Sequence, residues 1–133
     1  MYLLDINIIS YWMRGDLKLI NRIRGFSPSD LSLSTITLAE IYYGIEKSPV
    51  KKKERRLKID SIKSELEIFP FNEQAAVKYS IIRVELEKQG QPISERDTQI
   101  AAIALANKLC LVTHNTKEFI RIPKLRIEDW GPE

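Results

Sequence analysis

Short apolar runs alternate along the chain with longer stretches in which apolar residues recur every three or four positions. The apolar runs predict strands and the longer stretches predict helices. We expect strands over 2–4, 31–35, 68–71, 110–113 and 125–129. We expect helices over 6–14, 16–25, 36–47, 50–67, 73–89 and 95–108, with Asp16, Asn72 and Ser94 as N-caps of three of them.

This alternation predicts an α/β fold. A central, mostly parallel sheet would be flanked by α-helices on both faces. The 133 residues contain no repeat, linker or low-complexity tract, so we expect a single domain over 1–133. In open α/β sheets, ligands bind beyond the carboxyl ends of the strands. Candidate functional residues are therefore expected at those ends.

Three acids fall where apolar residues are expected. Asp5 ends the first apolar run in MYLLDINIIS, Glu40 shares a helix face with largely apolar residues in STITLAEIYYG, and Asp97 opens a helix with an apolar stripe. A buried carboxylate is normally neutralised, paired or bound to a metal. Ordinary structural roles are also open: Asp5 as a helix cap, Glu40 in an ion pair, Asp97 near the positive end of a helix dipole. Together the three acids favour one shared anionic pocket.

Carboxylates gathered in one pocket repel one another unless a cation lies between them. Oxygen ligands suit a hard divalent ion, Mg²⁺ or in its place Mn²⁺. His114 is the only histidine and Cys110 the only cysteine, which excludes a zinc site built from these ligands. A metal ion held by acids, with substrate phosphate completing its shell, indicates phosphoryl chemistry.

The segment THNTKEF follows the predicted strand 110–113 directly. Thr113, Asn115 and Glu118 would all reach the same edge of the sheet. A structural interpretation is equally open, in which Asn115 caps a short helix and Glu118 completes a capping box. The two interpretations do not exclude each other.

Charge and composition narrow the classes of function. The net charge of +3 permits a polyanionic partner without requiring one. The densest basic run, VKKKERRLK (50–58), is typical of a solvated helix face; if functional, it would make salt-sensitive phosphate contacts. A lone cysteine, no basic leader and no long apolar run indicate a cytoplasmic protein with no membrane contact.

Other chemistries find less support. The chain has neither GxGxxG nor GxxxxGK[ST], and His114 has no accompanying Ser or Cys motif, so cofactor-binding loops and nucleophilic triads are not indicated. The stretch LLDINI superficially resembles the hydrophobic-DxD motif of aspartyl phosphatases, but Asn7 stands where the second acid belongs.

Three stretches resemble PIN-domain ribonucleases of the VapC type, the toxins of type II toxin–antitoxin pairs. They are LLDINIIS, STITLAEIYYGIEKS and RDTQIAAIALANKLCLVTHNTKEFIRIPKLRIEDW. The resemblance spans nearly the whole chain and implies a PIN-like α/β fold forming one PIN domain over 1–133. Ile6 departs from the Asp-Thr-Asn that the family usually has in the first motif, which removes a hydroxyl.

The resemblance implies a Mg²⁺-dependent endoribonuclease that hydrolyses phosphodiester bonds. Asp5 and Asp97 would bind the metal, and Glu40 would bind it through water or orient the attacking water. The fourth ligand stays open between Glu118, the acid available, and Asn115, at a position where related sequences carry Asp or Asn. The resemblance also implies structured RNA such as tRNA as substrate, a homodimer, and a cognate VapB-like antitoxin that covers the acidic pocket.

Two other hypotheses remain. A non-catalytic PIN-like module that binds protein or RNA would cleave no RNA and show no Mg²⁺ dependence. An aspartyl phosphatase would release phosphate from small esters through a phosphorylated Asp5. Acids at three motif positions favour the ribonuclease over the binding module, and Asn7 counts against the phosphatase.

Overall fold

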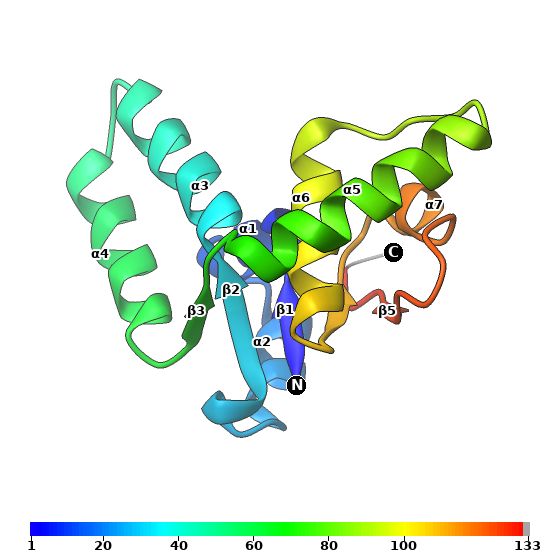
Figure 1. The fold of residues 1–133 in the computed structure, drawn as a ribbon. Coiled ribbons are helices and arrows are strands. Elements are labelled where there is room, and N and C mark those ends of the chain that lie inside the picture. The colour runs from blue at the N-terminus through cyan, green and yellow to red at the C-terminus, as the bar shows by residue number, and fades with distance from the viewer. Residues whose placement is uncertain (132–133) are drawn as a thin grey trace.

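A computed structural model describes residues 1–131 and shows a five-stranded sheet in the order β3-β2-β1-β4-β5 (Figure 1). Every neighbouring pair of strands is parallel. The strands are β1 (Tyr2–Leu4), β2 (Leu31–Ser34), β3 (Glu67–Phe69), β4 (Cys110–Val112) and β5 (Ile127–Glu128). The predicted α/β architecture is confirmed, and the sheet is wholly parallel. The last two residues of the predicted domain, 132 and 133, lie outside the described residues.

Helices connect the strands and cover both faces of the sheet. They are α1 (Ile6–Met13), α2 (Leu17–Arg24), α3 (Thr35–Lys47), α4 (Lys52–Lys63), α5 (Glu73–Lys88), α6 (Glu95–Ala106) and α7 (Thr116–Phe119), with a 3₁₀ turn at Pro28–Asp30. The predicted caps are confirmed, because Asp16, Asn72 and Ser94 each accept a backbone N–H at the start of a helix. No helix among residues 1–131 combines the length and the apolarity needed to cross a bilayer.

The sheet separates two hydrophobic cores. Leu4 and Val112 point into the core beneath α1, α2, α3 and α4, whereas Leu3 and Leu111 point into the core beneath α5, α6 and α7. Successive residues of a strand face opposite sides, so two covered faces require strands that are apolar throughout. This is why β1 and β4 read as continuous apolar runs, and why a polar residue directly after them stands out.

One predicted helix is too long. The pattern indicated a helix over 50–67, but α4 ends at Lys63 and β3 already begins at Glu67. Leu66 is buried in the same core as Ile59 and Ile62, so it continues the apolar stripe of the helix through the turn. Apolar spacing alone therefore gives no sign of the break. The α3–α4 pair forms the left side of the molecule in Figure 1, opposite α5 and α6.

Candidate active site

Asp5 lies at the carboxyl end of β1 and is almost fully buried, with 2% of its surface exposed. One carboxylate oxygen accepts the N–H of Ile6 at 2.8 Å, so Asp5 caps α1. The other accepts the hydroxyl of Thr113 at 2.9 Å. Thr113 follows β4, the strand beside β1, so two adjacent strand ends hold the carboxylate from both sides. Asp5 therefore caps a helix and also belongs to a polar cluster at the strand ends.

Thr113 extends this contact to a second acid. Its hydroxyl oxygen accepts the N–H of Asn115 at 3.0 Å, and the Asn115 side-chain amide reaches Asp97 at 3.4 Å. Asp97 lies in the first turn of α6, where its own N–H donates to the hydroxyl of Ser94 at 3.1 Å. A chain of polar contacts thus joins Asp5 to Asp97 across β1, β4 and α6.

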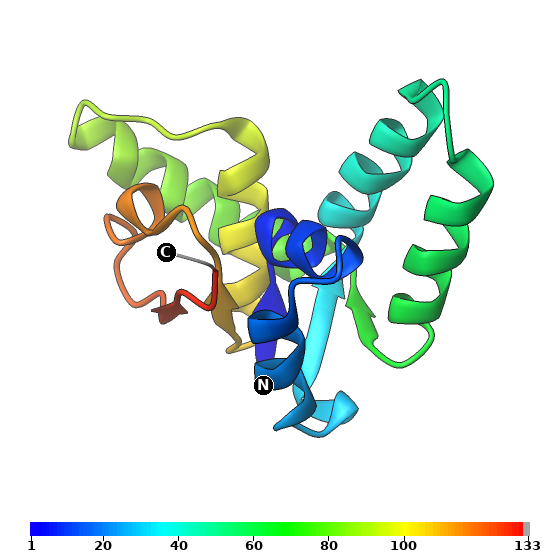
Figure 2. The same ribbon diagram turned by 180° about the vertical axis from the view of Figure 1, so that it is seen from behind.

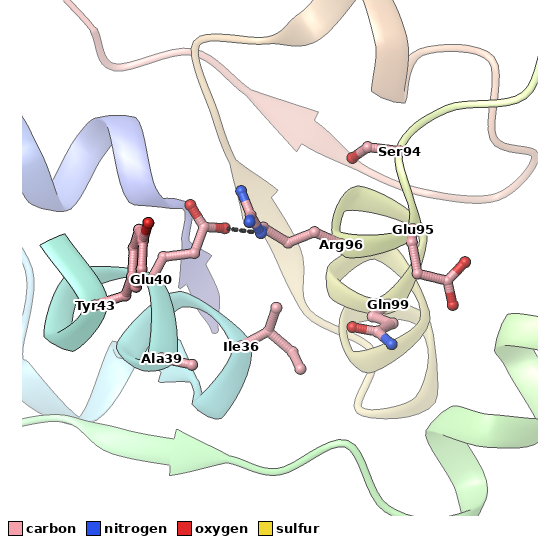
Figure 3. Close-up of a pocket in the computed structure, with 8 residues that line it drawn as sticks. All are labelled: Ile36, Ala39, Glu40, Tyr43, Ser94, Glu95, Arg96 and Gln99. Carbon is pink, nitrogen blue, oxygen red and sulfur yellow. Dashed lines mark ion pairs between the residues drawn. The ribbon is translucent and has the colours of Figure 1, made fainter.

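Glu40 reaches the same region from α3 and pairs with Arg96 of α6. Arg96 Nε lies 2.8 Å from Glu40 Oε1, and Figure 3 shows the two side chains meeting between the helices. They line a groove of about 810 Å³ between α3 and α6. The remaining lining residues are Ile36, Ala39, Tyr43, Ser94, Glu95 and Gln99. The ion pair anticipated for Glu40 is therefore present, on the edge of an open groove.

Glu118 is directed elsewhere. Its carboxylate pairs with Arg121 at 2.8 Å, and Arg121 also donates to the backbone and side chain of Gln91. Asn115 occupies the N-cap position of α7, but the capping box that was one of two open interpretations is not formed, because Asn115 makes no side-chain cap hydrogen bond. The Asn115 side-chain amide instead donates to Asp97, and the Glu118 carboxylate pairs with Arg121.

Burial and neighbouring carboxylates raise the pKa values of Asp5, Glu40 and Asp97. Burial is the main cause that raises the pKa of Asp5, and the charge of Asp97 raises it further, against hydrogen bonds that lower it. Burial also raises the pKa of Glu40, where Arg96 opposes the rise while Asp5 and Asp97 add to it. Burial raises the pKa of Asp97 as well, with Arg96 opposing it and Glu118 adding to it. Asp5, Glu40 and Asp97 therefore share one electrostatic neighbourhood, which Glu118 affects only through Asp97.

The donor chemistry of this cluster fits a hard divalent cation. Its acids offer oxygen ligands only, and Glu40 Oε1 is buried without a hydrogen-bond partner in residues 1–131, since Arg96 approaches it outside hydrogen-bond geometry. Within the same residues, no group of three acids, histidines or cysteines is close enough to hold an ion as it stands. Glu40 and Glu118, which both pair with arginines, would have to turn toward the other acids.

Arg96 is a site residue that the sequence patterns did not indicate. It was available from position, because Arg96 precedes Asp97 in the first turn of the same helix and must lie near the same mouth. Ile6 has no hydroxyl to offer Asp5. A hydroxyl still reaches Asp5, because Thr113, which follows the neighbouring strand β4, donates one to it.

Comparison with known proteins identifies the family. A model of the PIN domain matches residues 2–125. The chain belongs to the PIN-domain family. Among curated PIN relatives, Ribonuclease VapC2 of Rickettsia felis is 38% identical over 136 residues, and tRNA(fMet)-specific endonuclease VapC of Salmonella typhimurium is 37% identical over 130 residues. Each alignment covers 97% of both chains, so the relatives share the whole domain.

Solved PIN structures share the fold over the same length. The crystal structure of VapBC2 from Rickettsia felis, bound to a DNA fragment from their promoter, contains a chain with a TM-score of 0.90 and 37% identity, covering 98% of both chains. DNA-bound VapBC from Salmonella typhimurium gives a TM-score of 0.90 at 35% identity over the same share. The family resemblance and the PIN-like fold predicted from the sequence are confirmed.

Proposed function

We propose that this PIN domain is a divalent-metal-dependent endoribonuclease, the toxin of a toxin–antitoxin pair. One observation carries the proposal: Asp5, Glu40 and Asp97 share one electrostatic neighbourhood at the carboxyl ends of β1 and β4, where parallel α/β sheets bind ligands. Curated relatives that span nearly the whole chain are named ribonucleases, which supports the same reaction.

We assign the metal as Mg²⁺, with Mn²⁺ as a substitute, and its ligands as Asp5 and Asp97. Glu40 would bind through water or orient the attacking water. When bound, the ion would lower the pKa of a water and neutralise charge on the scissile phosphate. Of the two candidates for the fourth position, Asn115 is better placed, because it already contacts Asp97 whereas Glu118 is held by Arg121.

The residues of the chain orient these acids. The Thr113 hydroxyl and the Ile6 N–H fix both oxygens of Asp5, and these hydrogen bonds favour its charged form. Arg96 holds Glu40 and opposes the rise in its pKa, which keeps Glu40 available as an acceptor for a water proton.

The names of the relatives indicate the substrate class and the partner. The Salmonella relative is called a tRNA(fMet)-specific endonuclease, so we propose a transfer RNA as substrate. Several solved relatives are VapBC complexes, so we propose a cognate VapB-like antitoxin that covers Asp5, Glu40 and Asp97. We propose a homodimeric toxin from the family resemblance of the sequence alone.

The test is cleavage of a transfer RNA preparation with and without Mg²⁺, by the wild-type chain and by Asp5→Asn and Asp97→Asn. Replacing an outer-shell partner of a metal ligand typically reduces activity by 10- to 100-fold, so replacing a ligand should reduce cleavage by at least about 100-fold. Full activity in either variant would remove that residue from the metal site. A wild-type chain that cuts no RNA with either Mg²⁺ or Mn²⁺ would instead favour the non-catalytic binding module.

A further inference from the structure

A second polar pocket lies at the far end of α1. It has a volume of about 430 Å³ and lies between the end of α1 and the first half of α4. We call it the basic pocket. Three of its five lining residues are cations and none is an acid: Ser10, Met13, Arg14, Arg55 and Lys58.

Backbone contacts position two of these cations. Arg14 Nε donates to the carbonyl of Ser10 at 3.3 Å, and the guanidinium lies 5.1 Å from the ring centre of Tyr11. Lys58 Nζ donates to the carbonyl of Met13 at 3.3 Å, which ties α4 to the end of α1. Side chains that are already positioned lose less conformational entropy when they bind a ligand.

The three cations lack counterions, in contrast to three other cations of α4. On α4, Arg56 and Lys63 both pair with Asp60, and Lys52 pairs with Glu46. Within residues 1–131, no carboxylate forms an ion pair with Arg14, Arg55 or Lys58. Like charges that converge without an acid repel one another, and an anion between them would relieve that repulsion.

The position of the pocket indicates which anion it binds. Asp5 caps the first turn of α1, and Arg14 follows its last turn, roughly 13 Å away at 1.5 Å per residue. Figure 2 shows α1 between α6, which carries Asp97, and the α3–α4 pair. A polyanion bound at the acidic cluster and running along α1 toward α4 would reach the basic pocket.

We propose that the basic pocket binds a backbone phosphate of the RNA substrate, a few nucleotides from the bond that is cut. This inference rests on the proposed function, because it takes RNA as the ligand. RNA is favoured over an acidic peptide because the pocket lies one α1 length from the acidic residues, where the proposed function places the RNA backbone. The basic run 50–58 is thus divided between a phosphate site and a solvated face.

The test measures binding rather than cleavage. The Asp5→Asn protein is titrated in EDTA with fluorescein-labelled bulk transfer RNA over a range of salt concentrations. Arg14→Gln and Arg55→Gln should each raise the dissociation constant about fivefold, the effect of losing a partly exposed ion pair. Each should also lower the slope of log affinity against log salt by roughly one, because one phosphate contact is lost.

Lys53→Gln is the matched control for a single charge. Lys53 is exposed on α4 and lies roughly 140–160° around the helix from Arg55 and Lys58. The double variant, Arg14→Gln with Arg55→Gln, is compared with Lys53→Gln with Lys78→Gln, which removes the same total charge. Thermal unfolding of every variant confirms that it is folded.

Three outcomes would overturn the proposal. The first is that the Lys53→Gln protein loses as much affinity as the pocket variants, because binding would then depend only on net charge. The second is an unchanged salt slope. The third is that poly-glutamate competes as well as RNA and loses affinity in the same variants, which would assign the pocket to an acidic protein segment.

The proposed nuclease activity is tested separately, by cleavage with the wild-type chain and Mg²⁺. A chain that fails to cleave while its pocket variants lose RNA affinity would refute the nuclease and leave the phosphate site standing.

Discussion

Asp5 shows how one residue can serve both fold and site. As the cap of α1 it accepts a backbone N–H, and as a buried acid beside Asp97 its charged form is disfavoured. The sequence offered these roles as alternatives, because a carboxylate after an apolar strand fits either. What sequence could not show was Thr113, 108 residues away, as its second partner. Such a contact exists only once β1 and β4 are known to pair.

The burial of Asp5 makes stability depend on pH. Its pKa is higher in the folded than in the unfolded chain, so its contribution to stability is fully present below the unfolded pKa and is lost as pH rises through the folded pKa. Asn carries no charge to bury. Asp5→Asn should therefore be more stable than wild type at neutral pH without metal, with a difference that vanishes below about pH 4.

Thermal unfolding in EDTA across a pH series measures this. Asp30→Asn, at an exposed position, is the control and should show no such pH-dependent gain. An Asp5→Asn protein that is less stable than wild type at neutral pH would show that the lost hydrogen-bonding strength outweighs the relief of burying a charge.

Thr113 is the residue on which the geometry of the cluster depends. Thr113→Val keeps the shape but leaves the Asn115 N–H and one oxygen of Asp5 without their partner, which should cost about 1–3 kcal/mol of stability. The pKa of Asp5 should rise further, because a hydrogen bond that lowers it is lost. The pH at which cleavage is half-maximal should therefore move upward.

Ser32→Ala separates this effect from simple destabilisation. Ser32 is also fully buried and donates its hydroxyl to the backbone carbonyl of Tyr2, away from the acids. It should lose stability without moving the pH profile. A profile that is unchanged in Thr113→Val would contradict the role given to its hydroxyl.

At the scale of elements, sequence predicted the order of strands and helices and three of the helix caps, because these depend on local spacing and on cap chemistry. It failed where two patterns overlap, as at Leu66, which extends the stripe of α4 beyond the helix end. At α7 it left two interpretations open for Asn115 and Glu118, and tertiary partners decide between them: the Asn115 amide contacts Asp97, and Glu118 pairs with Arg121. Contacts with residues of other elements, or beyond the helix, thus outweigh the local preference of Asn115 and Glu118 for capping.

The contact between α3 and α6 through Glu40 and Arg96 is open to a direct test. Arg96→Gln removes a cation that competes with a metal ion for Glu40 and Asp97. Because Arg96 is 58% exposed, the ion pair is worth at most about 1 kcal/mol. The dissociation constant for Mn²⁺ should therefore fall by up to roughly fivefold at alkaline pH, where the acids are charged.

Isothermal titration calorimetry with Mn²⁺ measures this change. Arg56→Gln is the matched control, because Arg56 is 55% exposed and pairs with Asp60 on α4. The same affinity in Arg96→Gln as in wild type would mean that Glu40 does not contribute to metal binding.

For the whole molecule, the acidic cluster lowers stability in the absence of a cation and links folding to metal binding. Three carboxylates with raised pKa values are gathered by the fold and dispersed when the chain unfolds. A ligand that binds only the folded state adds RT ln(1 + [L]/Kd) to the free energy of unfolding, about 2.7 kcal/mol at one hundred times Kd. Mg²⁺ should therefore raise the Tm of the wild-type chain in proportion to the logarithm of its concentration.

This stabilisation should depend on the proposed ligands alone. Asp5→Asn and Asp97→Asn should unfold at temperatures that Mg²⁺ hardly changes, whereas Lys53→Gln, at an exposed position of α4, should respond as wild type does. Differential scanning fluorimetry with Mg²⁺, and with K⁺ at equal ionic strength, distinguishes binding from screening. If K⁺ stabilises the chain as much as Mg²⁺ does, the ion merely screens the carboxylates, and the cluster is not a metal site.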